Sequence, residues 1–492
     1  MRFLSIAGKI NKLGVNSLMS NDTNSLNDIY KGLPGGPQDI FYSQPEVDTK
    51  PTFVKGKGIY LWDEKGKKYI DASSGPVTCN LGHANQEILE AINQQGQKLS
   101  FSFPSTGRNQ PNIELSKQVA TMAGEGFERV LFASGGSEAM DMAIKFARQL
   151  RHAQGETKRN RLISCQPSYH GMNLSSLAVS GDPIFSEIFS DMITMGEKIP
   201  AMMDYKDNHN NGIQRLLEDE FVYQSSKLLE EKITQMGSDN VLAFIIEPVG
   251  GSSSGALAPP ENYFNQIRKI CNKYGVLLIY DEVMSGSGRT GEFLTSHLWP
   301  NARPDISVIA KGLGAGYMPL GAMLTSAKLV DELTSLTGFN YAYTYNASPV
   351  ACAAGIAVLE QINKQNLLQN CREKSAYLKS QLESMKQNHP SLGDVRGRGL
   401  LLGIELVSSQ KTRKSLPLEL NSVELFKSIA VKNGLLIYGR RSNQGIYGDV
   451  VLVAPPINSS QSEVEEIINL LDISFTEFEK QLLSLKALSY FN

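Results

Sequence analysis

Five short apolar runs in the middle of the chain place the strongest constraint on its fold. Continuous runs of this length are typical of strands that are buried on both faces of a largely parallel sheet. They cover residues 129–134, 162–165, 241–249, 275–283 and 305–311. Segments with helical character lie between them, at residues 137–152, 213–236 and 262–274. Strand followed by helix, repeated, predicts an α/β fold whose large domain is built on a mostly parallel sheet.

The flanking parts of the chain have a different pattern. From residue 51, apolar and polar residues alternate between turn-forming glycines, which predicts a small antiparallel meander, followed by a helix at 86–99. The last part begins with a helix near residue 349, continues with two strand-like runs and closes with a helix at 462–485. We expect the meander and this last part to pack together as one small α+β domain, because neither buries much core alone.

These patterns predict the domain boundaries. An N-terminal arm covers residues 1–50, and the N-terminal part of the small domain covers 51–100. The large domain covers 101–345, and the C-terminal part of the small domain covers 346–492.

The charge and cysteine content limit the partners and the compartment. The net charge of −2 lacks the basic excess of a nucleic-acid-binding protein, and no apolar run approaches the roughly 18 residues that span a membrane. The five cysteines are scattered, which fits neither a disulfide framework nor a zinc site and predicts a cytoplasmic protein without a metal. Residues 1–20 carry three basic residues and no acid, so a mitochondrial transit peptide is the alternative to a disordered arm.

Polar residues follow four of the apolar runs, at the edge where ligands bind in open α/β sheets. They are the stretch 134–137 with Gly136 and Ser137, then Glu247, Asp281 and Lys311. Two glycines followed by a helix start at Ser137 favour a phosphate site, since backbone N–H groups and the helix dipole point at the ligand there. A serine N-cap after a glycine turn is the alternative.

Asp281 and Lys311 each place a charge at the end of a buried strand, and burying a charge costs free energy. One explanation is a buried ion pair that holds the sheet together. The other is pyridoxal phosphate (PLP), which needs a lysine for a Schiff base, an acid on its pyridine nitrogen and a phosphate cup. The chain offers all three in the order cup, acid, lysine, and burial would favour the neutral, nucleophilic lysine. Tyr169, after the second run, either stacks on the cofactor ring or is an ordinary packed aromatic residue.

A series of motifs in the same order resembles the class III PLP-dependent aminotransferases of fold type I. This group includes ornithine, 4-aminobutyrate, diaminopelargonate and omega-amine:pyruvate enzymes. The resemblance runs from about Phe53 to the C-terminus. Its motifs are SGGSEA, YHG, EPVGG, DEVMSGSGRTG, AKGLGAGYMPLGAM, TYNASPVACAA and VRGRG. Met284 and Ser287 depart from the family pattern, and we expect this to alter contacts around the ring and pocket.

The resemblance assigns roles to residues of this chain. Lys311 matches the Schiff-base lysine, and Asp281 matches the acid on the pyridine nitrogen. Val283 and Tyr169 match residues on the two ring faces. Gly136 and Ser137 match the phosphate cup, and Glu247 matches a further residue of the cofactor site. Thr344 matches a threonine that reaches the phosphate across a subunit interface, which implies a homodimer with shared active sites.

Three arginines are candidates for holding a substrate carboxylate, because a guanidinium binds a carboxylate with two parallel hydrogen bonds. By resemblance, Arg396 matches an arginine that binds the α-carboxylate and often pairs with the residue matching Glu247. Arg440 or Arg441 matches a mobile arginine of omega-amine:pyruvate enzymes. The predicted function is amino transfer from an amine or amino acid to a keto acid, with pyruvate slightly favoured, by a ping-pong mechanism. The alternative is a racemase, epimerase or aminomutase of the same family.

Overall fold

The computed structural model describes residues 50–183, 188–202, 218–441, 445 and 448–485. The chain forms two units, residues 1–53 and 54–492, and nearly all described residues belong to the second. Most of the predicted arm, the basic segment 1–20 and the first residues of the predicted helix 213–236 therefore lie outside the described residues. The predicted boundaries at residues 100 and 345 remain predictions.

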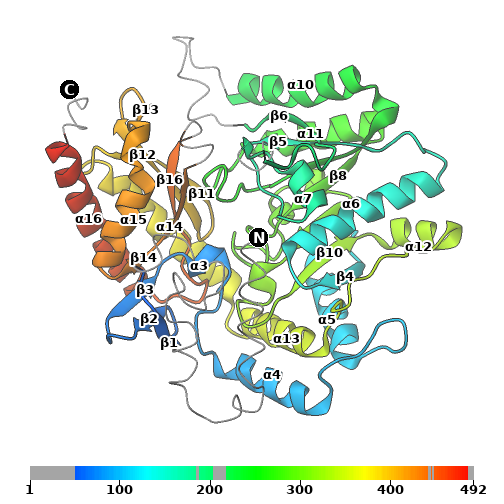
Figure 1. The fold of residues 1–492 in the computed structure, drawn as a ribbon, viewed down its shortest axis with the longest axis horizontal. Helices are drawn as coiled ribbons and strands as arrows, with labels where there is room; N and C mark the ends of the chain where they lie inside the picture. Colours follow the sequence, from blue (N-terminus) through cyan, green and yellow to red (C-terminus); the bar gives the residue numbers. More distant parts are fainter. Residues whose placement is uncertain (1–49, 184–187, 203–217, 442–444, 446–447, 486–492) are drawn as a thin grey trace, which may run out of the picture. The chain divides into compact units, whose positions relative to one another are not determined.

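A seven-stranded sheet forms the centre of the second unit (Figure 1). Strand β10 is antiparallel to both of its neighbours, and the other strands run parallel, as the apolar runs predicted. In spatial order the strands are β4 (Arg129–Ala133), β10 (Gly321–Thr325), β9 (Ile306–Ile309), β8 (Leu277–Asp281), β7 (Val241–Ile246), β5 (Arg161–Gln166) and β6 (Glu197–Pro200).

The register of this sheet brings the predicted site residues to one edge. Asp281, the last residue of β8, pairs with Val308 of β9, so Lys311 follows three residues further along. Tyr280 pairs with Ile246, the last residue of β7, so Glu247 leaves the sheet beside Asp281. These neighbouring strands are fully buried along their length, because helices cover both faces of the sheet.

Helices connect the strands and cover the sheet. They are α5 (Gln110–Ala123), α6 (Gly136–Ala153), α7 (Leu174–Val179), α10 (Glu218–Met236), α11 (Glu261–Tyr274) and α12 (Ala327–Leu336). On α6, Ala139, Ala143 and Ala147 are completely buried, and their small side chains let the helix axis approach the sheet closely. Helices α4 (Gln86–Lys98) and α13 (Pro349–Lys364) pack against each other (Figure 1).

Two smaller sheets complete the unit. The first contains β1 (Phe53–Lys57), β2 (Tyr60–Asp63), β3 (Lys68–Asp71) and β14 (Leu435–Leu436). Because β14 pairs with β3, sequence-distant segments share one sheet. The second contains β11 (Leu392–Arg398), β12 (Leu401–Ser409), β13 (Lys414–Ser415), β16 (Asp449–Val453) and β15 (Tyr438–Arg441). Further helices among the described residues are α3 (Ser74–Val77), α14 (Leu367–Met385), α15 (Ser422–Lys432) and α16 (Gln461–Ser484).

Candidate active site

A cavity of about 290 Å³ lies at the carboxyl edge of the large sheet. All of the predicted cofactor residues except Thr344 line it. They are Gly136, Ser137, Tyr169, Glu247, Asp281, Val283 and Lys311. Sequence reasoning missed other parts of the wall, including Thr78 and residues 318–320. These residues follow no buried strand and show no periodicity that would have distinguished them.

Lys311 directs its amine into this cavity from the turn after β9. Its backbone has φ of 44°, a left-handed conformation that is uncommon for a residue other than glycine and is often found at functional sites. Burial lowers the pKa of Lys311 to about 8, although the carboxylates of Asp281 and Glu247 favour the charged form. Among the described residues, no hydrogen-bond or ion-pair partner holds its Nζ. The amine is therefore available to react.

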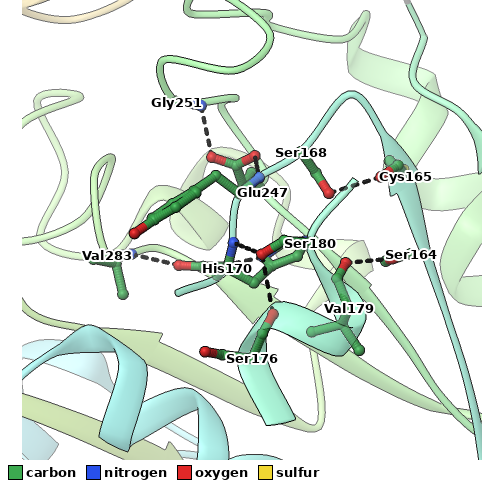
Figure 2. Close-up of polar contacts among 12 residues, drawn as sticks. Ser164, Cys165, Ser168, His170, Ser176, Val179, Ser180, Glu247, Gly251 and Val283 are labelled. Carbon is green, nitrogen blue, oxygen red and sulfur yellow. Dashed lines mark hydrogen bonds and ion pairs between the residues drawn. The ribbon is translucent and has the colours of Figure 1, made fainter. Parts of the chain in front are cut away.

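Asp281 is held by groups other than Lys311. Its Oδ2 lies 2.8 Å from Nδ1 of His170, and its Oδ1 accepts a hydrogen bond of 3.0 Å from the backbone N–H of Val283 (Figure 2). The alternative of a direct Asp281–Lys311 ion pair is thus not what the structure shows. Asp281 is 5% exposed, so these contacts fix a buried carboxyl group that faces the cavity.

His170 is a site residue that the sequence reasoning did not assign. Its backbone N–H donates to Oγ of Ser180 over 2.9 Å, and Ser180 in turn donates to the carbonyl of Ser176 over 3.0 Å (Figure 2). The imidazole is buried and lines the cavity beside Asp281. In the sequence, His170 could have been recognised as a site residue because it directly follows Tyr169, shortly after a buried strand.

The predicted phosphate cup is formed by the turn before α6 and the first turn of that helix. The helix begins at Gly136 and the N-cap is Gly135, so Ser137 is not a serine N-cap. The Ser137 hydroxyl accepts a hydrogen bond of 3.1 Å from the backbone N–H of Met172. A Cβ atom on Gly136 would lie 2.9 Å from Cγ1 of Val283, so only glycine leaves room for the valine here.

Glu247 occupies the wall next to Tyr169. Its carboxylate accepts hydrogen bonds from the backbone N–H groups of Gly251, over 2.7 Å, and Tyr169, over 3.2 Å (Figure 2). Burial raises the pKa of Glu247 to about 7 despite these bonds, so the group exchanges a proton near neutral pH. It contacts Tyr169 through the backbone and leaves the tyrosine ring free to border the cavity.

The three candidate arginines occupy different environments. Arg396 is bound to the carboxylates of Asp394 (3.1 Å) and Glu405 (2.9 Å) and does not line the cavity. It is not paired with Glu247. Because successive residues of a strand point to opposite faces, Arg440 and Arg441 diverge.

Arg441 donates to Asp449 over 3.1 Å, away from the cavity wall. The guanidinium of Arg440 lies 5.8 Å from the centre of the Tyr169 ring and is bound to the buried carboxylate of Asp182. Arg440 is therefore the candidate nearest to the cavity. Thr344 is exposed and does not line the cavity of its own chain.

The residues present fit PLP. A lysine amine without a partner among the described residues, a fixed buried carboxyl group and a helix start with no side-chain cap line one cavity, and these are the three kinds of group that such a cofactor requires. Among the described residues, no group of three or more His, Cys, Asp or Glu side chains is arranged to hold a metal ion.

The chain belongs to the class III aminotransferases, since residues 41–473 match the family described as Aminotransferase class-III. An uncharacterized aminotransferase of Bacillus subtilis, YodT, is 35% identical, over 89% of this chain and 98% of its own length. The putrescine–pyruvate aminotransferase of Pseudomonas aeruginosa is 31% identical, over 87% of this chain and 91% of its own. The diaminobutyrate–2-oxoglutarate transaminase of Halomonas elongata is 33% identical, over 84% and 87%.

Solved structures agree with this assignment. An amine transaminase from an uncultivated Pseudomonas species, solved with PLP bound, has a TM-score of 0.81 at 31% identity and covers 90% of this chain and 98% of its own. The protein is therefore a PLP-dependent aminotransferase of fold type I. No helix within the described part of the chain is long and apolar enough to cross a membrane.

Proposed function

We propose that this aminotransferase moves an amino group from an amine or amino acid to a keto acid, with pyruvate as the favoured acceptor, in two half-reactions of ping-pong type. The observation that carries the proposal is Lys311, whose amine lies in the cavity without a partner among the described residues and has a pKa of about 8. When bound, PLP supplies an aldehyde that takes up the amino group and a ring that draws electrons from the substrate carbon.

Different side chains of the cavity have different roles in the proposed reaction. Lys311 would hold the cofactor, and its free amine would move a proton at the substrate Cα as general acid and base. Asp281, oriented by His170 and the N–H of Val283, keeps the ring nitrogen protonated. Ser137 and the first N–H groups of α6 would bind the phosphate, and Tyr169 and Val283, which line the same cavity, would enclose the ring. Glu247 lines the same cavity beside Tyr169.

The surroundings of Arg440 support a monocarboxylate acceptor. All three arginines bind carboxylates of this chain, but of the three Arg440 is the one that also lies over the ring of Tyr169, a residue of the cavity wall. A substrate carboxylate would compete with Asp182 for this guanidinium. A second carboxylate, as in 2-oxoglutarate, would face the acids Glu247 and Asp281. The relative from Pseudomonas aeruginosa is named for pyruvate, and that from Halomonas elongata for 2-oxoglutarate.

Steady-state kinetics with a panel of amine donors tests the proposal. We expect alanine to form from pyruvate faster than glutamate forms from 2-oxoglutarate, with parallel lines in double-reciprocal plots. Arg440→Ala should raise the KM for pyruvate about tenfold or more and leave the KM for an apolar amine unchanged. Arg441→Ala is the matched control. Intersecting lines, a preference for 2-oxoglutarate, or racemisation of an amino acid without a keto acid would contradict the proposal.

A further inference from the structure

Asp141 is a buried carboxylate outside the cavity. It lies on α6, four residues and thus about one turn after Ser137 of the phosphate cup. It is 5% exposed, and a buried charge is costly unless it is paired and hydrogen-bonded. Lys145 Nζ lies 2.6 Å from its Oδ2, and the hydroxyls of Ser175 and Tyr343 donate to its two oxygens. Burial acts to raise the pKa of Asp141, but these three bonds outweigh it and lower the pKa.

The hydroxyl of Ser175 connects Asp141 with the phosphate cup. Ser175 gives its single hydroxyl proton to Asp141 and stands two residues after Asn173 on the same segment. The side-chain amide of Asn173 donates to the carbonyl of Ser137 over 2.9 Å. The neighbouring N–H of Met172 donates to the Ser137 hydroxyl over 3.1 Å. Asp141 therefore holds in place the segment that orients Ser137.

The second hydroxyl belongs to an otherwise exposed segment. Tyr343 is half-buried, whereas Thr344 and Tyr345 beside it are exposed. Burial and the bond to Asp141 raise the pKa of Tyr343, so its phenol keeps the proton that it donates. The ammonium of Lys145 lies 5.6 Å from the centre of the Tyr343 ring. These contacts fix the backbone from which Thr344 projects.

We propose that Asp141 and Tyr343 are positioning residues. Together they fix the phosphate cup of one subunit relative to the segment around Thr344, which would contact the cofactor of the other subunit. This inference rests on the proposed cofactor contacts of Ser137 and Thr344. It does not depend on which keto acid is used. A change at Tyr343 should thus alter the affinity for the cofactor in the active sites of both subunits, although neither Tyr343 nor Asp141 contacts the cofactor.

Titration of the apoprotein with PLP, followed by absorbance and without any substrate, tests the proposal. Tyr343→Phe removes the hydroxyl and should weaken PLP binding about tenfold, since a hydrogen bond to a charged group is lost. Tyr341→Phe is the matched control, because Tyr341 is exposed and its ring also lies near Lys145, at 5.4 Å. Equal affinities for Tyr343→Phe and wild type, or equal losses in the two variants, would overturn the proposal.

Three further variants locate the effect. If Tyr343 acts partly through Thr344, the losses of affinity in Tyr343→Phe and Thr344→Ala will not add in the double variant. Additive losses would refute the coupling to Thr344. Asp141→Asn should weaken PLP binding more than Tyr343→Phe, because it affects both hydroxyls. The unfolding midpoint of each apoprotein shows whether the variant is folded, and a failure to use pyruvate would leave these results unaffected.

Discussion

Lys311 combines a left-handed backbone with a depressed pKa, and both features follow from its place at the end of a buried strand. An exposed lysine has a pKa near 10.4 and is almost fully charged at neutral pH. Because burial lowers the pKa of Lys311 to about 8, its neutral fraction rises steeply as the pH increases through 8.

We therefore expect the rate at which apoprotein recombines with PLP to increase about tenfold per pH unit below pH 8 and to level off above it. Stopped-flow absorbance between pH 6 and 10 measures this profile. A rate that keeps rising to pH 10 would show that Lys311 titrates like an exposed lysine.

Gly136 shows how one missing side chain shapes the site. An alanine Cβ at this position would meet Cγ1 and Cγ2 of Val283 at 2.9 and 3.0 Å, closer than real Cβ contacts. Overpacking of this kind costs about 1–3 kcal/mol, so Gly136→Ala should weaken PLP binding by about fivefold or more. Gly96→Ala is the control, because nothing lies within 4 Å of a Cβ there. Unchanged affinity in Gly136→Ala would refute the packing argument.

At the scale of the elements, Arg289 joins segments that are far apart in the sequence. It is fully buried and donates to the carbonyls of Leu400 and Pro455 and to the side chains of Ser74 and Asn80. Burial lowers the pKa of Arg289 to about 10, and it remains a cation at neutral pH. The segment before β12, the end of β16 and the segment after β3 thus meet at one guanidinium.

Arg289→Lys keeps the charge but cannot reproduce the planar fork of donors. We expect the free energy of unfolding to fall by about 3 kcal/mol, since several buried acceptors lose their bonds. Arg129→Lys, in an exposed ion pair with Asp331, should change it by less than about 0.5 kcal/mol. Urea denaturation of the two variants measures both values, and equal stabilities would contradict this role for Arg289.

The elements also show what the sequence could predict. The central strands were predictable because runs such as 241–249 are apolar without interruption, and the acids and the lysine directly follow them. Strands β6 and β10 were missed, because Glu197–Pro200 is short and partly polar and Gly321–Thr325 follows a glycine-rich stretch. The contacts of His170 and Arg289, and those of Asp141 with Ser175 and Tyr343, depend on tertiary packing between distant segments, which no local pattern specifies.

At the scale of the whole molecule, we expect a homodimer with shared active sites. Thr344 is exposed on its own chain and does not line its own cavity, which is the placement that a residue serving a partner subunit requires. Light scattering should give twice the mass of one chain.

Mixed dimers test the sharing directly. A heterodimer of a Lys311→Ala chain and a Thr344→Ala chain contains one site with both defects and one intact site. It should retain about half of the wild-type activity. If Thr344 serves its own chain, the remaining site will be as impaired as in the Thr344→Ala homodimer.

Peptide mass spectrometry after borohydride reduction tests most directly whether Lys311 binds PLP covalently in this cavity. Lys198 provides an internal comparison, because burial also lowers the pKa of Lys198 to about 8 although it lies outside the cavity. We expect the pyridoxyl group on the peptide containing Lys311 and not on the peptide containing Lys198. Reduced protein without the modification, or with the group on Lys198 or any other lysine, would contradict the account.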